Sequence, residues 1–441
     1  MWGYYVALAL RSSARSKALT TLVVALLAFG VSACMVSYAV FRATTSDPIP
    51  SRSSRLYVPQ IDNFGPSPYG NEPSQTLSYT DAIALWQARA ASRQTLVYPA
   101  KWEVASDNRS VSAMSLSGDA VTAEFFAMFD VPFRFGSGWS PGDDARHATE
   151  VVISRRLNEK LFRGQNSIGR EIRLDGKVFR IAGVLDDWNP KPRFFDVSAL
   201  GPLSSFDDTG DIYIPFTRAI DMGKMATYDL CPSYSKDLGI TDWRRFLGSE
   251  CVWIAAWVEL ATPSDVERYR EYLRNYAAEQ QRIGRFSWPP NIRLRGLMDW
   301  MAYEHVTPKA STLSMLVSAS FLLIVLVNVV GLMLARFMRR APEIGIRRAL
   351  GASRATVYRQ FLIEGATIGC VGGLFGVVLT LLGLWGIGGL FEPNIARIVR
   401  ADATLLALTV LLAIATTLVS ALYPTWRAAQ IQPAWQIKIN N

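Results

Sequence analysis

Four long apolar runs, set apart by charged segments, limit what this 441-residue chain can fold into. Each run is long enough to cross roughly 30 Å of hydrocarbon as a helix. Charged residues stand at or near the run ends, since a charge at a helix centre would cost roughly 3 kcal/mol on insertion. The runs are Ala18 to Phe41, Leu313 to Phe337, Phe361 to Leu390 and Ala403 to Tyr423. The sequence therefore predicts transmembrane helices over 18–41, 311–337, 361–390 and 403–423.

Basic residues near the run ends predict which side of the membrane each connection occupies. Arginines and lysines precede the first run, crowd between the second and third, and follow the fourth. Under the positive-inside rule, segments 1–17, 338–360 and 424–441 are cytoplasmic, and segments 42–310 and 391–402 lie on the far side. These inner arginines also explain the excess of 46 basic over 37 acidic residues. No nucleic-acid partner is therefore predicted.

The first run is interpreted as an uncleaved anchor rather than a signal peptide. Val31 to Cys34 resembles a lipoprotein cleavage box, but the apolar stretch continues through Phe41. Signal peptides have shorter apolar regions that stop near the cleavage site. Before the anchor, aromatic and basic residues mix over 1–17, which predicts a short helix lying on the inner membrane surface.

The far-side region 42–310 is long enough for a sizeable core, and its pattern predicts a mixed α+β domain. Apolar residues at helical spacing predict a helix over Ser78 to Ser92, and Thr122 and Ser154 are candidate caps of two further helices. Asp175-Gly176 stands between two alternating segments, which predicts a tight hairpin. Prolines and glycines break up the region about 186–252, which is interpreted as an inserted second lobe. The predicted fold class is an α-helical membrane domain of four transmembrane helices plus a large extracytoplasmic α+β domain with two subdomains.

Cysteine positions suggest one crosslink. Cys231 and Cys251 both fall in the far-side region, where an oxidising compartment favours a disulfide. The alternative is two unpaired buried thiols. Cys34 and Cys370 lie inside predicted membrane helices and are not expected to join them.

Several kinds of chemistry have no sequence signal. No Walker A loop occurs, so the chain is not expected to bind a nucleotide in that way. His147 and His305, the two histidines of the chain, lack metal-ligand spacing, and no G-x-S-x-G elbow marks a nucleophile. A Ser-His-Asp group assembled in space stays open, although ordinary surface or loop histidines are the simpler interpretation. No catalytic residue, metal site or bound cofactor is predicted.

The segment 338–360 contains residues that typically start and end a short helix. Pro342 suits a first helical position, Glu343 suits the positive helix start, and Gly351 provides a stop. The helix would expose aliphatic side chains with cations between them. The alternative is a solvated charged loop that only sets orientation.

In the third apolar run, small residues on neighbouring turns favour close helix packing, within or between protomers. These are Gly369, Gly372, Gly373 and Gly376. The alternative is a generic glycine-rich span. Glu364, near the inner end of this run, is expected to anchor the helix at the interface or to pair with a cation, rather than to line a transport path.

Several stretches resemble MacB/FtsX-type ABC-transporter permeases. They are Glu343 to Ala352, Gln360 to Glu364, Gly372 to Gly376 and Tyr423 to Pro433. Val121 to Asp186 is similar to the periplasmic core domain of the MacB branch. The resemblance implies a bacterial inner-membrane permease whose coupling helix docks on an ATPase subunit. The coupling residues it implies are Glu343, Ile344, Gly345, Ile346, Arg347, Arg348, Ala349, Leu350 and Gly351.

The same resemblance implies a mechanism and partners. A separate ATPase chain would bind ATP and Mg and move the coupling helices of two permease chains, identical or different. The spans would carry that movement to the periplasmic domain, which expels a peptide, lipopeptide, lipoprotein or drug. A periplasmic adaptor and an outer-membrane channel are further expected partners, beside membrane lipid. The alternatives are a signalling module that regulates envelope hydrolases or peptide resistance, and a membrane receptor without an ATPase.

Overall fold

The computed structural model describes residues 17–66, 71–105, 114–197, 202–232, 242–340, 346, 350–351, 353–387, 398–399 and 401–429. The predicted surface helix over 1–17 and most of the loop 391–402 therefore lie outside the described residues. The chain divides into two compact units. The first comprises Met1–Thr45 with Lys309–Asn441, and the second comprises Ser46–Pro308.

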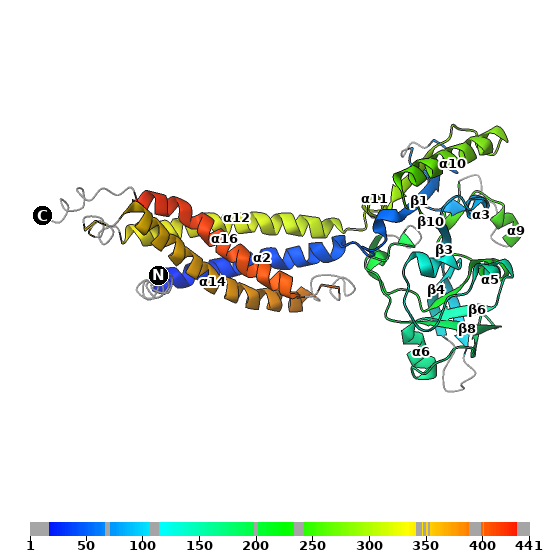
Figure 1. Ribbon diagram of the computed structural model, residues 1–441, viewed down its shortest axis with the longest axis horizontal. Helices are drawn as coiled ribbons and strands as arrows, with labels where there is room; N and C mark the ends of the chain where they lie inside the picture. Colours follow the sequence, from blue (N-terminus) through cyan, green and yellow to red (C-terminus); the bar gives the residue numbers. More distant parts are fainter. Residues whose placement is uncertain are drawn as a thin grey trace. The chain divides into compact units, whose positions relative to one another are not determined.

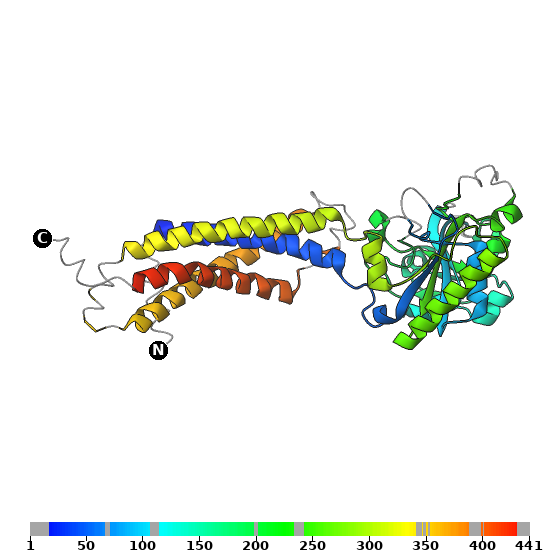
Figure 2. The same cartoon turned by 90° about the horizontal axis from the view of Figure 1, so that it is seen from above.

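Among its described residues, the first unit contains four helices long and apolar enough to cross a membrane. They are α2 (Lys17–Thr45), α12 (Lys309–Met338), α14 (Arg354–Gly386) and α16 (Ala403–Ala429), seen side by side in Figures 1 and 2. α14 begins seven residues before the apolar run, because the Ser353 hydroxyl accepts a hydrogen bond from the Thr356 amide, 3.2 Å away. α16 continues through Pro424, past the predicted end at residue 423.

Packing in the first unit places α2 and α16 against both of the other helices. α12 packs on α2 and α16, and α14 packs on the same two helices. Buried Val325, Val329 and Met333 of α12 meet Val23 of α2 in one apolar cluster. Because lipid is as apolar as these side chains, close packing holds the bundle together.

The second unit is built on an 11-stranded sheet whose main path runs β11-β1-β10-β3-β4-β9-β6-β8-β5. β4 pairs with β9 and β6 with β8 in parallel, and the other pairings are antiparallel. The path strands are β1 (Leu56–Ile61), β3 (Arg93–Ala105), β4 (Met114–Val121), β5 (Phe133–Gly136), β6 (Glu150–Ile153), β8 (Lys177–Leu185), β9 (Ile212–Pro215), β10 (Val252–Glu259) and β11 (Ile292–Gly296). Beside the path, β2 (Leu77–Ser78) pairs with β10, and β7 (Glu171–Leu174) pairs with both β3 and β8.

The double pairing of β7 closes part of the sheet on itself. The hydrogen-bonded circuit runs β3-β4-β9-β6-β8-β7 and back to β3. A closed circuit leaves no free strand edge along it. Its strands contribute Trp102, Phe179, Ile181 and Ile214 to the main buried core.

This topology corrects the predicted inserted lobe. The region about 186–252 is not a separate unit, because its strand β9 lies between β4 and β6 in the same sheet. Pro190, Pro192 and Pro202, which suggested a lobe, lie in the connection that leads from β8 to β9. The predicted fold class, four membrane helices plus a large domain of mixed helices and strands, is confirmed.

Helices cover the sheet and connect its strands (Figure 1). They are α3 (Tyr79–Ala88), α4 (Glu124–Met128), α5 (Pro141–Ala145), α6 (Arg155–Phe162), α8 (Phe216–Asp221), α9 (Trp243–Leu247), α10 (Pro263–Arg282) and α11 (Leu297–Tyr303), with short 3₁₀ helices η1 (Ser53–Arg55) and η2 (Pro202–Phe206). α10 packs on β1 and β11, and Leu273 on its inner face is fully buried.

Most of the helix-cap and turn predictions in the second unit agree with the structure. Ser154 caps α6 through the Leu157 amide, as predicted. The hairpin is confirmed: Leu174 pairs with Lys177, and Asp175 and Gly176 have φ of 47° and 75°, as a tight hairpin turn requires. The predicted cap by Thr122 is wrong. Its hydroxyl instead hydrogen-bonds Thr95 on the neighbouring strand, 2.9 Å away, and so joins β3.

Candidate functional site

The candidate site is the segment between α12 and α14, which the sequence predicts to be cytoplasmic. Among the predicted coupling residues, the structure describes Ile346, Leu350 and Gly351. The Leu350 amide donates a hydrogen bond to the Ile346 carbonyl at 3.0 Å, the spacing of one helical turn. Gly351 follows with φ of 99°, a conformation that ends a helix and favours glycine. Glu343, Ile344, Gly345, Arg347, Arg348 and Ala349 lie outside the described residues.

The two aliphatic side chains of this turn face outward. Ile346 is 64% exposed and Leu350 is 83% exposed. Residues four apart in a helical turn lie on one face, so the pair forms a small apolar surface. Such a surface is suited to insertion into an apolar groove of another protein.

A buried charge cluster lies where this segment joins the helices. Arg336 Nη2 of α12 lies 2.5 Å from Glu364 Oε1 of α14, and both side chains are 2% exposed. Arg340 Nη1 approaches the same carboxylate at 3.2 Å. Beside them, the rings of Phe337 and Phe361 lie 4.2 Å apart between centroids. Glu364 thus pairs with Arg336 of α12 and with Arg340 just after α12, one of the two roles expected for it.

The glycines of α14 face the neighbouring helices of the same chain. A Cβ at Gly369 would lie 2.8 Å from Ile414 Cα, and one at Gly373 would lie 3.0 Å from Val410 Cα, both on α16. Gly372 faces Leu27 of α2 in the same way, at 2.5 Å from Cδ2. Gly376 is less crowded, with nothing nearer than 3.6 Å. Glycine at the first three positions therefore lets α14 approach α16 and α2 closely.

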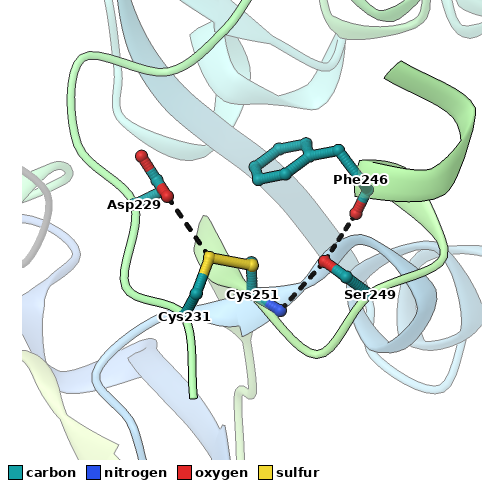
Figure 3. Close-up of a disulfide and its surroundings, with 5 residues drawn as sticks. All are labelled: Asp229, Cys231, Phe246, Ser249 and Cys251. Carbon is teal, nitrogen blue, oxygen red and sulfur yellow. Dashed lines mark hydrogen bonds between the residues drawn. A yellow bond between two sulfur atoms is a disulfide. The ribbon is translucent and has the colours of Figure 1, made fainter. Parts of the chain in front are cut away.

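Cys231 and Cys251 are joined by a disulfide, with their Cα atoms 4.1 Å apart (Figure 3). Cys251 stands directly before β10, and its amide hydrogen-bonds the Ser249 hydroxyl at 3.2 Å. Asp229 Oδ2 lies 3.4 Å from Cys231 Sγ. These three residues are close enough to suggest metal ligands, but sulfurs that are joined to each other are not thiolate ligands. Their role is therefore structural: the bond ties the loop before α9 to the start of β10.

The two histidines stand in exposed turns. His147 Nδ1 lies 2.6 Å from Asp221 Oδ2 of α8, and both side chains are about half exposed. His305 lies on the surface directly after α11. Among the described residues, no hydroxyl or thiol hydrogen-bonds either ring. The described part of the chain therefore contains no Ser-His-Asp group.

The second unit buries several carboxyl groups that sequence patterns did not single out. Desolvation raises the pKa of Asp144 to about 6, although Ala123 and Trp139 donate hydrogen bonds to it. Desolvation also raises the pKa of Glu304 to about 7. Burial and the neighbouring Asp196 carboxyl raise the pKa of Asp119 well above its usual range. Acidic residues are common on surfaces, so their sequence positions alone give no sign of this burial.

A polar cleft of about 450 Å³ opens beside the start of α6. Its two arginines pair with acidic neighbours: Arg156 binds Asp211 at 2.9 Å, and Arg155 reaches Asp186 at 3.4 Å. Acidic side chains outnumber these arginines in the lining, so the cleft carries a net negative charge.

Two family matches account for most of the chain. Residues 19–276 match the MacB-like periplasmic core domain, and residues 315–433 match the FtsX-like permease C-terminal domain. The chain belongs to the MacB/FtsX family of ABC-transporter permeases. The first match covers more than half of the chain and includes the closed strand circuit. The second contains the cytoplasmic segment, the Glu364 cluster and the glycine face of α14.

Curated relatives of this MacB/FtsX-family chain are larger proteins. It is 25% identical to the macrolide export ATP-binding/permease protein MacB of Azoarcus sp. over 96% of this chain and 57% of that protein. It is 28% identical to the pyoverdine export ATP-binding/permease protein PvdT of Pseudomonas entomophila, over 70% of this chain and 41% of that protein. The chain thus spans about half the length of these relatives. A comparison with the periplasmic region of MacB from Actinobacillus actinomycetemcomitans gives a TM-score of 0.36 at 11% identity, covering 59% of this chain and 97% of that chain.

The family and the four apolar helices together define the location. This MacB/FtsX-family permease is a multi-pass inner-membrane protein with a large periplasmic domain. The domain comprises Ser46–Pro308, between α2 and α12, so α2 and α12 are joined to it directly through the backbone.

Proposed function

We propose that this chain is the permease subunit of a MacB-type ABC exporter, driven by an ATPase on a separate chain. The sequence contains no Walker A loop, so the ATP and Mg of the assembly would be bound outside these 441 residues. Two relatives of this chain are named as macrolide export and pyoverdine export ATP-binding/permease proteins. The cargo classes we propose are a peptide, lipopeptide, lipoprotein or drug.

The exposed turn at Ile346 and Leu350 is the observation that carries this proposal. It presents two aliphatic side chains on the cytoplasmic side, between two membrane helices. Insertion of these side chains into a groove of the ATPase would remove them from water. The ATPase would then hold the segment and displace it when ATP closes the ATPase dimer. A solvated loop that does not bind the ATPase could not transmit this displacement.

Movement would pass from the segment into the bundle and then to the periplasmic domain. α12 receives the push at its inner end and leads by backbone into Pro308, the last residue of the domain unit. α14 packs closely on α2, whose other end leads into Ser46. A two-state change of this kind requires nucleotide to favour one arrangement of the bundle over the other. We propose a second permease chain, an adaptor and an outer-membrane channel as further partners.

The experiment is copurification in mild detergent from the source cells, comparing wild type with Leu350→Asp. We expect an ABC ATPase to copurify with the wild-type chain. Burying a charge in place of an apolar anchor should weaken its binding by about 2 kcal/mol or more, roughly 30-fold. The matched control is Ile283→Asp, which changes a 58% exposed aliphatic residue of the periplasmic domain. The control should keep the ATPase.

Two results would contradict the proposal. One is the absence of any ATPase with the wild-type chain, as a receptor would show. The other is equal ATPase recovery with Leu350→Asp and wild type. Deleting the copurified ATPase and following both cargo efflux and cell-wall hydrolase activity then separates export from the signalling alternative. Export predicts that efflux is lost while hydrolase activity is unchanged.

A further inference from the structure

Glu364 connects the two ends of the cytoplasmic segment. Arg336 stands at the inner end of α12, Arg340 follows two residues after that helix ends at Met338, and Glu364 is the eleventh residue of α14. Glu364 Oε1 lies 2.5 Å from Arg336 Nη2 and 3.2 Å from Arg340 Nη1. One side chain thus joins the inner end of α12 to the inner part of α14.

The ion pair between Arg336 and Glu364 is buried in apolar surroundings rather than exposed at the surface. Both Arg336 and Glu364 are 2% exposed, and Phe337, Val357 and Phe361 of the same helix ends lie in one buried apolar cluster. Exposed ion pairs exchange readily with water, whereas a buried pair that loses one partner leaves an uncompensated charge. The pair therefore has one strongly preferred arrangement.

The rest of the bundle gives α12 and α14 less direct contact. Each packs mainly on α2 and α16. Side chains near the inner ends join α12 to α14 directly: Glu364 binds Arg336, and the Phe337 and Phe361 rings lie in contact at a tilt of 48°. Without that link, a push on the segment could displace one helix and leave the other in place.

We propose that Glu364 is a positioning residue that clamps the two ends of the coupling segment, so that α12 and α14 move as one body. This inference rests on the proposed function, because it assigns a role in transmitting the push. It concerns neither the ATPase groove nor the cargo. It places the rigid element of the transmission inside the membrane, one step beyond the segment that the ATPase would hold.

The test measures the distance between spin labels on either side of the clamp. Labels are attached through Arg339→Cys and Arg359→Cys, both at exposed positions, in a chain whose free cysteines Cys34 and Cys370 are replaced by alanine. The full chain is studied in lipid nanodiscs. Unaltered Glu364 should give a single narrow distance distribution. Glu364→Gln should lose that narrow peak, and the exchange of both charges, Arg336→Glu with Glu364→Arg, should restore it.

A matched control removes an exposed ion pair at the other end of the bundle. Arg42 of α2 and Asp402 lie 2.9 Å apart, with both side chains more than a third exposed. Asp402→Asn should leave the label distance unchanged. If Glu364→Gln is not recovered as folded protein, Glu364→Asp is used instead. This variant keeps the negative charge, but its shorter side chain cannot reach the arginines as closely. It too should broaden the distribution.

A second arm uses the complex with its copurified ATPase and a non-hydrolysable ATP analogue. In the wild type the label distance should stay single and narrow with nucleotide, while Glu364→Gln should broaden further because the segment pulls one helix alone. A purely structural role would give no response to nucleotide. An unchanged distribution in Glu364→Gln or Glu364→Asp, with and without nucleotide, would overturn the clamp. If no ATPase copurifies, the proposed function fails, and the first arm still decides whether Glu364 holds the helix ends together.

Discussion

The glycine face of α14 allows a sharp test of the helix packing. Gly369→Ala adds one methyl group where Ile414 Cα of α16 would lie 2.8 Å from the new Cβ. That neighbour is backbone, so it cannot rotate away and the helices must separate. Gly331→Ala, on α12, adds the same methyl group where nothing lies within 4 Å. The two variants make the same chemical change and differ only in the space around it.

The expected magnitudes follow from that difference. Forcing an extra methyl group into a packed interface costs about 1–3 kcal/mol. At Gly331 no contact opposes the change, and alanine favours a helix over glycine by up to about 1 kcal/mol in water. Gly369→Ala should therefore lower the free energy of unfolding of the helix bundle by about 1–3 kcal/mol. Gly331→Ala should leave it unchanged or raise it slightly.

Equilibrium unfolding in mixed detergent and SDS micelles, followed by tryptophan fluorescence, provides the comparison. Trp385 near the end of α14 and Trp426 in α16 report on the two helices that Gly369 brings together. Equal unfolding free energies for the two variants would refute the reasoning, because α14 and α16 would then not be packed as closely as the structure shows.

Two further predictions concern the periplasmic domain within the full chain. Cys231→Ser opens a disulfide between residues 20 apart in sequence, and the loss of that constraint on the unfolded chain should destabilise the domain by about 3 kcal/mol. Reductant should lower the thermal midpoint of the wild type but not of the variant, and equal sensitivity in both would contradict the prediction. The pKa of Glu304 is about 7 in the folded state, against 4.5 for the free side chain, so the folded protein binds this proton more tightly. Protonated Glu304 therefore stabilises the fold fully below about pH 4.5, and this stabilisation is lost as the pH rises through 7. Glu304→Gln should reduce this loss of unfolding free energy, by up to about 3 kcal/mol at pH 8. An unchanged pH profile of domain stability would show that Glu304 is not buried as described.

Features that depend on neighbouring residues were predictable. The membrane helices follow from local hydropathy, and Asp175-Gly176 produced the expected hairpin because its residues can adopt positive φ. Ser154 caps its helix for a similarly local reason, since its hydroxyl reaches an amide three residues away. Thr122 had the same local signal, yet its hydroxyl bonds Thr95 on the neighbouring strand instead. Tertiary contact overrode a local preference there.

Features that depend on distant residues were not predictable. The region about 186–252 looked like a lobe because its breaks are local, while the pairing of β9 with β4 and β6 joins strands far apart in the chain. The sequence suggested pairing Cys231 with Cys251 from their compartment, and the fold brings their Cα atoms to 4.1 Å. The burial of Glu304 and Asp119 had no sequence signal at all.

The amino-acid sequence by itself determined the four membrane helices and the glycine at which the described cytoplasmic turn ends. It did so because hydration and backbone preference act on each residue and its near neighbours. The tertiary structure decided how the periplasmic strands close into a circuit and which helices the glycines of α14 touch. It also decided that Glu364 pairs with Arg336 and Arg340 rather than anchoring at the interface. These outcomes depend on segments meeting in space, and the entropy of closing the chain between them leaves no trace in local composition.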